Sequence, residues 1–147
     1  MIADADRAGA GGIGDQPVWS PSGQYVLLPT YGTTAGGGMV RALVDGSSTV
    51  TLQFDPALAA EDWFESAMYN PLSVTDTEFL ASAGVGGANA QLGEPSNVIL
   101  YQLNETFDTI MNGDVIAQGE LIGWDVAGQS VWIQTESGMQ SFPLPGH

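Results

Sequence analysis

The sequence predicts an all-β protein of antiparallel strands, and three observations support this. Apolar and polar residues alternate in short runs, as between Thr49 and Phe54, which is the period of a half-buried strand. The chain contains 20 Gly and 8 Pro, a composition suited to many turns. One turn-and-strand pattern recurs along the chain. The 147 residues are enough for a single domain with its own core.

The recurring pattern is a tryptophan after a short apolar run, then a turn that contains glycine, then a second apolar run. Trp19 in the first copy lies 105 positions before Trp124 in the third copy. Gly23 and Gly128 have the same separation, and both are expected to adopt positive φ in their turns. A divergent copy runs from Met68 to Ser82. A period of about 52 residues predicts a repeat architecture, with propeller blades of four antiparallel strands as the best match.

The first copy also resembles a known repeat. Residues 19–23 read Trp-Ser-Pro-Ser-Gly, and the strand-forming run 24–28 follows them. This order resembles the TolB-type β-propeller repeat, which carries Trp-Ser-Pro-Asp-Gly-Lys before a strand. Ser22 replaces the usual Asp, and the third copy has Val126-Ala127 in place of Pro-Asp. The resemblance covers about residues 15–145 and implies a WD-like propeller repeat protein of about three blades.

The expected blades span residues 16–54, 64–111 and 120–145, after a flexible N-terminal arm at 1–15. The segment 55–65 has helical character and would connect the first two blades, and Asn112-Gly113 is expected to form a turn before the third. The strands are expected at 16–20, 24–31, 39–44 and 49–54, at 67–70, 78–83, 97–103 and 106–111, and at 120–125, 129–135 and 139–144.

The third blade has three candidate strands, whereas the first two have four. Propellers generally need four to eight blades to close their ring, so three blades would leave open sides and unpaired edges. The sequence therefore predicts a partial propeller, completed by missing blades, by further copies of itself or by another protein subunit. A β-sandwich of about ten strands is the alternative fold.

Charge excludes several classes of partner. The chain has 17 acidic residues against two arginines and no lysine, for a net charge of −15. Binding to nucleic acid needs cationic groups that replace the phosphate counterions, so it is not expected, and neither is binding to anionic membranes. No apolar run approaches the length of a membrane span, so direct insertion is not expected. An extracytoplasmic location is expected, although no signal peptide is visible at the N-terminus.

The sequence offers little catalytic material. The sole histidine is His147, the chain has no cysteine, and no lysine is present, so a Ser-His-Asp triad, a thiolate nucleophile and a Schiff base are not expected. A catalytic pair of carboxylates is the remaining possibility, and the candidates for it are Glu61, Asp62 and Glu65. Clustered surface acids of this kind, however, usually form a solvated face. The chain is therefore not expected to be an enzyme, and no cofactor is expected. Asp4 and Asp6 are candidate Ca²⁺ ligands.

The remaining candidates are structural or bind partners. Trp63, Phe64 and Phe142 are candidate partner-binding residues, since exposed aromatic side chains often anchor interfaces. Asn104-Glu105-Thr106 is a glycosylation sequon, but it sits where a hairpin turn favours asparagine. Core packing is expected for Trp132 as well as for the two repeat tryptophans. The structural set is Trp19, Pro21, Gly23, Trp124 and Gly128.

Two function classes follow from these patterns. The first is a non-enzymatic protein–protein interaction or scaffold module, a subunit or fragment of a larger assembly. The second is the propeller portion of an extracytoplasmic glycan-binding protein or hydrolase, which would use Trp63 and the carboxylates near it.

Overall fold

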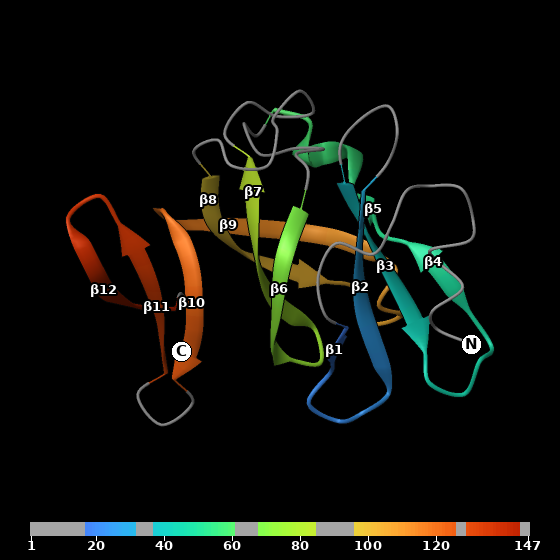
Figure 1. Cartoon of the computed structure of the whole chain (residues 1–147). Coiled ribbons are helices and arrows are strands. Elements are labelled where there is room, and N and C mark those ends of the chain that lie inside the picture. The colour runs from blue at the N-terminus through green and yellow to red at the C-terminus, as the bar shows by residue number, and fades with distance from the viewer. Residues whose placement is uncertain (1–16, 32–36, 61–67, 85–95, 126–128, 145–147) are drawn as a thin grey trace.

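The computed structural model describes residues 17–31, 37–60, 68–84, 96–125 and 129–144. These residues form an all-β structure of three open sheets, and no propeller is detected among them (Figure 1). The first sheet has the order β1 (Val18–Trp19), β2 (Tyr25–Tyr31), β3 (Gly37–Leu43), β4 (Thr49–Thr51). The second has the order β5 (Gln53–Phe54), β9 (Thr109–Gln118), β8 (Ser96–Leu103), β7 (Glu78–Gly84), β6 (Met68–Thr75). The third has the order β10 (Glu120–Asp125), β11 (Ser130–Thr135), β12 (Gly138–Pro143).

The all-β prediction is confirmed, and most strands lie where the alternation predicted them. Apart from β5, the strands of each sheet pair antiparallel with their sequence neighbours. One strand is displaced from its expected position, because β9 covers residues 109–118 where a strand at 106–111 was expected. The turn before β2 also has the expected form. Gly23 has a φ of 77°, and its N–H donates to the Ser20 carbonyl over 2.9 Å. Gly128 lies outside the described residues.

The second sheet lies between the other two, and its central strands β7 and β8 are buried on both faces (Figure 1). Alternate residues of its central strands contribute to different cores, because successive side chains point to opposite faces. Phe79 and Tyr101 belong to the core shared with the first sheet, and their rings stack with centroids 5.0 Å apart. Leu80 and Leu100 belong to the core shared with the third sheet. This double burial explains the nearly continuous apolar run of 98–101.

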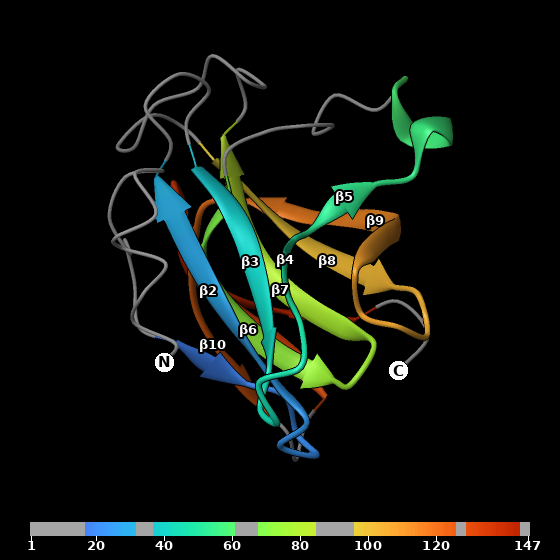
Figure 2. The same cartoon turned by 90° about the vertical axis from the view of Figure 1, so that its right-hand side faces the viewer.

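The first and second sheets are not separate, as independent blades would be. The chain from Thr49 to Phe54 pairs first with β3 and then, as β5, parallel with β9, so it passes from the first sheet to the second (Figure 2). Leu52, at the crossing, is buried and its N–H donates to the Met39 carbonyl over 2.8 Å. Gln53 then donates to Asp108 over 3.1 Å. The outer edges of these two sheets are therefore joined by hydrogen bonds, which the repeat pattern did not predict.

The chain passes from the second sheet to the third in a similar way. β9 ends at Gln118 and β10 begins at Glu120, so Gly119 alone connects them. Gly119 has a φ of 154°, and a Cβ built on it would collide with the carbonyl oxygen of Gln134. Only glycine fits this corner, because any side chain would overlap the β11 backbone.

One local prediction was wrong. Asn112-Gly113 is not a turn but lies inside β9, where these residues pair with Gln102 and Tyr101 of β8. Cross-strand pairing and burial of the neighbouring Ile110 outweigh the local turn preference of the Asn-Gly pair. Within the described part of 55–65, the helical character is limited to a 3-10 turn at Pro56–Leu58, to which Asp55 adds a hydrogen bond from the Ala57 N–H over 3.0 Å.

The open sides expected for three blades are not both exposed in the structure. On the far side of the first sheet, Val26, Leu28, Val40 and Ala42 form a cluster with exposed fractions of 9% or less. That face is therefore already buried within this chain. On the third sheet, by contrast, large apolar side chains are exposed.

Candidate functional site

The outer face of the third sheet presents large apolar side chains to solvent. Val131 and Ile133 of β11 face inward to the core, so Trp132 between them faces outward, and its side chain is 39% exposed. Met139 of β12 is 54% exposed and pairs with Gln134, which faces the same way as Trp132. Ile122 lies at the irregular step between β10 and β11 and is 49% exposed. These three residues, Ile122, Trp132 and Met139, are called the third-sheet patch.

The pairing of the strands explains why Trp132 is not covered. Its cross-strand neighbours are Gly123 on β10 and Ser141 on β12, and neither has a side chain large enough to shield an indole ring. A Cβ built on Gly123 would meet no atom within 4 Å. Neither cross-strand neighbour therefore covers the indole ring of Trp132.

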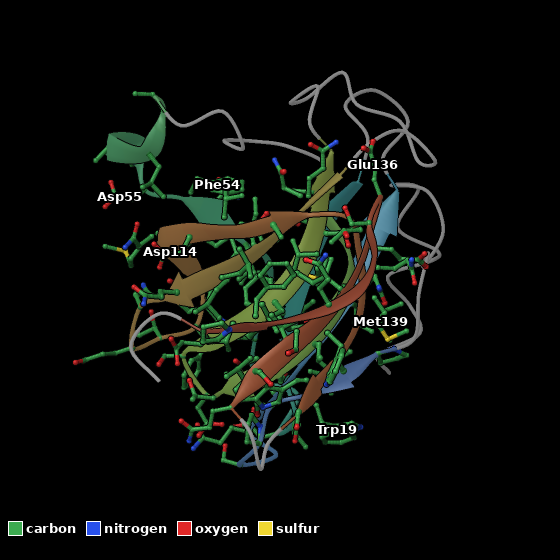
Figure 3. The ribbon with its side chains drawn as sticks, turned by 90° about the vertical axis from the view of Figure 1, so that its left-hand side faces the viewer. Trp19, Phe54, Asp55, Asp114, Glu136 and Met139 are labelled. Atoms are coloured by element: carbon green, nitrogen blue, oxygen red, sulfur yellow. The ribbon has the colours of Figure 1, made fainter. Side chains whose placement is uncertain are left out.

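The third sheet also has a free edge. Among the described strands, β12 pairs only with β11, so its other side carries unpaired backbone groups. Pro143 limits this edge near its end because it has no N–H. Two exposed acidic residues flank the sheet, Glu136 in the β11–β12 turn and Glu120 at the start of β10. In Figure 3, Glu136 and Met139 lie on the same side of the view as Trp19, away from Asp55 and Asp114.

Two of the three tryptophans expected in the core are exposed. Trp19 is 55% exposed, because β1 is an edge strand of only two residues and covers little of the sheet. Trp132 faces outward for the reason given above. Trp124 is the exception, since it is partly buried, pairs with Val131 and packs against the inner core.

The predicted partner-binding and metal-binding residues are only partly described. Phe142 packs against the inner core opposite Val131, so it does not belong to the exposed patch. Trp63 and Phe64 lie outside the described residues, as do Asp4 and Asp6. The same holds for the carboxylates at 61, 62 and 65 and for His147. Within the described ranges, no group of three or more His, Cys, Asp or Glu side chains could hold a metal ion.

Sequence reasoning missed a second feature, a cleft where the first and second sheets meet. It has a volume of about 610 Å³ and is lined by Gln24, Leu43, Val44, Asp45, Thr106 and Phe107. Leu43, Val44 and Phe107 make its apolar walls, and the carboxylate of Asp45 is its charged group.

The wall around Phe107 belongs to a tightly bonded turn between β8 and β9. The Asn104 side chain accepts from the N–H of Asp108 over 3.0 Å and donates to the Asp108 carboxylate over 2.7 Å. Thr106 and Thr109 donate hydroxyl hydrogen bonds to the same carboxylate oxygen. These three donors hold the pKa of Asp108 below its usual value. The side chain of the sequon asparagine is thus part of the turn, as turn chemistry predicted.

A buried arginine joins this turn to the first sheet. Arg41 is 3% exposed, and its guanidinium donates to the carbonyls of Phe107 over 2.9 Å and of Thr106 over 3.3 Å. A third hydrogen bond goes to the Ser48 carbonyl over 3.3 Å. Phe107 has a φ of 60°, a conformation that few bulky residues adopt, and its ring lies 4.8 Å from that of Tyr25. No sequence signal predicted this positive φ, because it depends on contacts between strands far apart in the chain.

The fold and these two surfaces define an all-β protein of three packed sheets, with an open apolar sheet face at one end and a cleft between the other two sheets. The chain matches no protein-family model and no curated protein. The TolB-type resemblance therefore stays a prediction from the sequence. Among the described residues, no helix is long and apolar enough to cross a membrane.

Proposed function

We propose that this chain is a non-enzymatic protein–protein interaction module whose third sheet is completed by another protein. The single observation that carries the proposal is the third sheet itself. It combines an exposed apolar patch with a strand edge that no described strand pairs, and an edge of this kind is a template for strand addition.

The repeat pattern supports the same proposal. The first sheet and the β6–β9 part of the second are four-stranded meanders, whereas the third has three strands. If the sheets are blades of a propeller-like repeat, the place beside β12 belongs to a fourth strand. An extended segment of the partner would occupy this place and cover Trp132 and Met139.

Charge determines which partner fits best. A second copy of the chain would also carry a net charge of −15, and repulsion between the two like-charged copies opposes their association. A segment that alternates apolar and basic residues would face the patch with its apolar side chains and meet the surrounding carboxylates with its basic ones. We therefore infer a partner with a basic, β-forming segment.

The alternative, a glycan-binding protein or a hydrolase, depends on Trp63 and the acids at 61, 62 and 65. These residues lie outside the described part of the chain, and nothing within it favours that alternative.

Two matched peptides test the proposal, one alternating valine with lysine and the other alternating valine with glutamate. The lysine peptide should bind the full chain and protect the amides of β12 from hydrogen exchange, whereas the glutamate peptide should not. Trp132→Thr should weaken binding about tenfold or more, as expected for the loss of a central aromatic contact. Trp19→Thr is the matched control, because Trp19 is also exposed, at 55% against 39% for Trp132, but lies on the first sheet.

Two results would contradict this assignment. The first is equal binding of the lysine peptide to both tryptophan variants, since the patch would then contribute nothing. The second is a micromolar dimer in sedimentation that Trp132→Thr abolishes, which would make a second copy the occupant of this sheet.

A further inference from the structure

The cleft between the first and second sheets is independent of the third-sheet patch. Its walls come from three connections between strands: the β1–β2 turn, the β3–β4 hairpin and the β8–β9 turn. A volume of about 610 Å³ lies within the range of small-molecule sites. Val44, in its wall, is 45% exposed.

Backbone hydrogen bonds fix these walls relative to one another. The N–H of Val44 donates to the Gln24 carbonyl over 2.9 Å, which joins the hairpin to the β1–β2 turn. Asp45 is held within the hairpin, because its carboxylate accepts from the Ser47 N–H over 2.8 Å. The opposite wall is fastened by the bonds from Arg41 to the carbonyls of Thr106 and Phe107. The chain's own hydrogen bonds therefore hold the walls of the cleft in place.

The chemistry of the lining selects for positive charge joined to an apolar group. Phe107 supplies an aromatic ring, and aromatic rings attract cations as well as apolar groups. The hydrogen bonds from Ser47 lower the pKa of Asp45, so this carboxylate is ionised at neutral pH. Arg41 is the only Lys or Arg side chain in the described residues, and it is buried against carbonyls instead of pairing with Asp45. A net charge of −15 would also attract cations to this surface.

We propose that this cleft binds a small organic amine, with its ammonium group beside Asp45 and its apolar body against Leu43, Val44 and Phe107. An apolar anion would meet the charge of Asp45 and is excluded. A neutral ligand of the same shape would keep the apolar contacts but lose the ionic one.

The test compares 2-phenylethylamine with 2-phenylethanol, a neutral molecule of nearly the same shape. Each is titrated into the full ¹⁵N-labelled chain while the backbone amide signals are followed by NMR. The amine should shift the amide signals of Val44, Asp45 and Phe107. It should also bind about fivefold more tightly than the alcohol, a ratio at the upper end of that expected for one solvent-exposed ion pair.

Asp45→Asn should remove this preference and leave the alcohol unaffected, because asparagine keeps an oxygen that can accept from the Ser47 N–H. Glu136→Gln removes one exposed charge from the β11–β12 turn of the third sheet, which does not line the cleft, and should leave the preference unchanged. The proposal is overturned if amine and alcohol bind the wild-type chain equally. It is also overturned if the amine shifts the amide signals of all acidic residues, or if Asp45→Asn and Glu136→Gln reduce amine binding to the same extent.

Discussion

The corner at Gly119 gives the sharpest test of how the three sheets are joined. Gly119→Ala adds one methyl group at a position with a φ of 154°, where a side chain is strained whatever space is available. The added Cβ would also collide with the Gln134 carbonyl oxygen and lie only 2.7 Å from Cγ2 of Ile133. The first atom belongs to the β11 backbone, so a side-chain rotation cannot remove the overlap.

The expected loss of stability follows from these two effects. A residue held in such a region of φ/ψ costs about 1–3 kcal/mol, and overpacking a well-packed site costs about as much again. Together they predict a loss of about 2–6 kcal/mol in the free energy of unfolding, with a central value of about 4 kcal/mol. For a domain with an ordinary total of about 5–15 kcal/mol, this is a large fraction.

Urea unfolding followed by circular dichroism measures this loss. With a slope of about 2 kcal/mol per molar urea, the midpoint for Gly119→Ala should fall by about 2 M. Gly123→Ala is the matched control, because it adds the same methyl group to β10 with no atom within 4 Å. Its stability should stay within about 0.5 kcal/mol of wild type. Equal midpoints for the two variants would refute the argument that a glycine corner joins β9 to β10.

Three further predictions concern the turns, the buried cation and the tyrosines. Gly23→Val should lower the unfolding free energy by about 1–3 kcal/mol in the same urea assay, whereas Gly23→Asn, which tolerates positive φ better, should lower it less; equal losses would contradict the strain argument. Arg41→Met should lower the free energy of unfolding by about 3 kcal/mol and broaden the NMR signals of residues 104–109, because three carbonyls lose a charged donor. Unchanged NMR signals for these residues would mean that Arg41 does not fix the β8–β9 turn. Burial raises the pKa of Tyr101 well above 10, and burial together with the charge of Asp76 does the same for Tyr25. Above about pH 10 the folded state therefore keeps phenol protons that the unfolded state releases. The free energy of unfolding should be constant up to about pH 10 and fall as pH rises further, less steeply in Tyr101→Phe. An unfolding free energy that stays constant to pH 12 would contradict this.

Local sequence patterns predicted the strands well because each strand alternates or is buried over a short window. The expected strands at 78–83 and 120–125 correspond to β7 and β10 almost residue for residue. The turn at Gly23 was predictable for the same reason, since the need for positive φ is local.

The features that were missed depend on residues far apart in the chain. The parallel pairing of β5 with β9 joins Gln53 to Thr109, and no local pattern encodes it. The cleft depends on Arg41 reaching the turn at Thr106 and Phe107, a separation of more than 60 residues. The exposure of Trp19 and Trp132 depends on what lies across the sheet, whereas the sequence indicates only that a tryptophan ends or occupies a strand.

The crossing strand at 49–54 has a consequence for the order in which the molecule folds. β1 to β4 can form from hairpins between neighbours in sequence, but β5 has no partner until β9 exists, more than 50 residues later. Closing so long a loop is slow compared with forming a hairpin. During synthesis on the ribosome, Gln53 and Phe54 can therefore pair with Thr109 and Ile110 only after those residues have emerged. This waiting period is when the nascent chain would be most vulnerable to aggregation and would most need a chaperone.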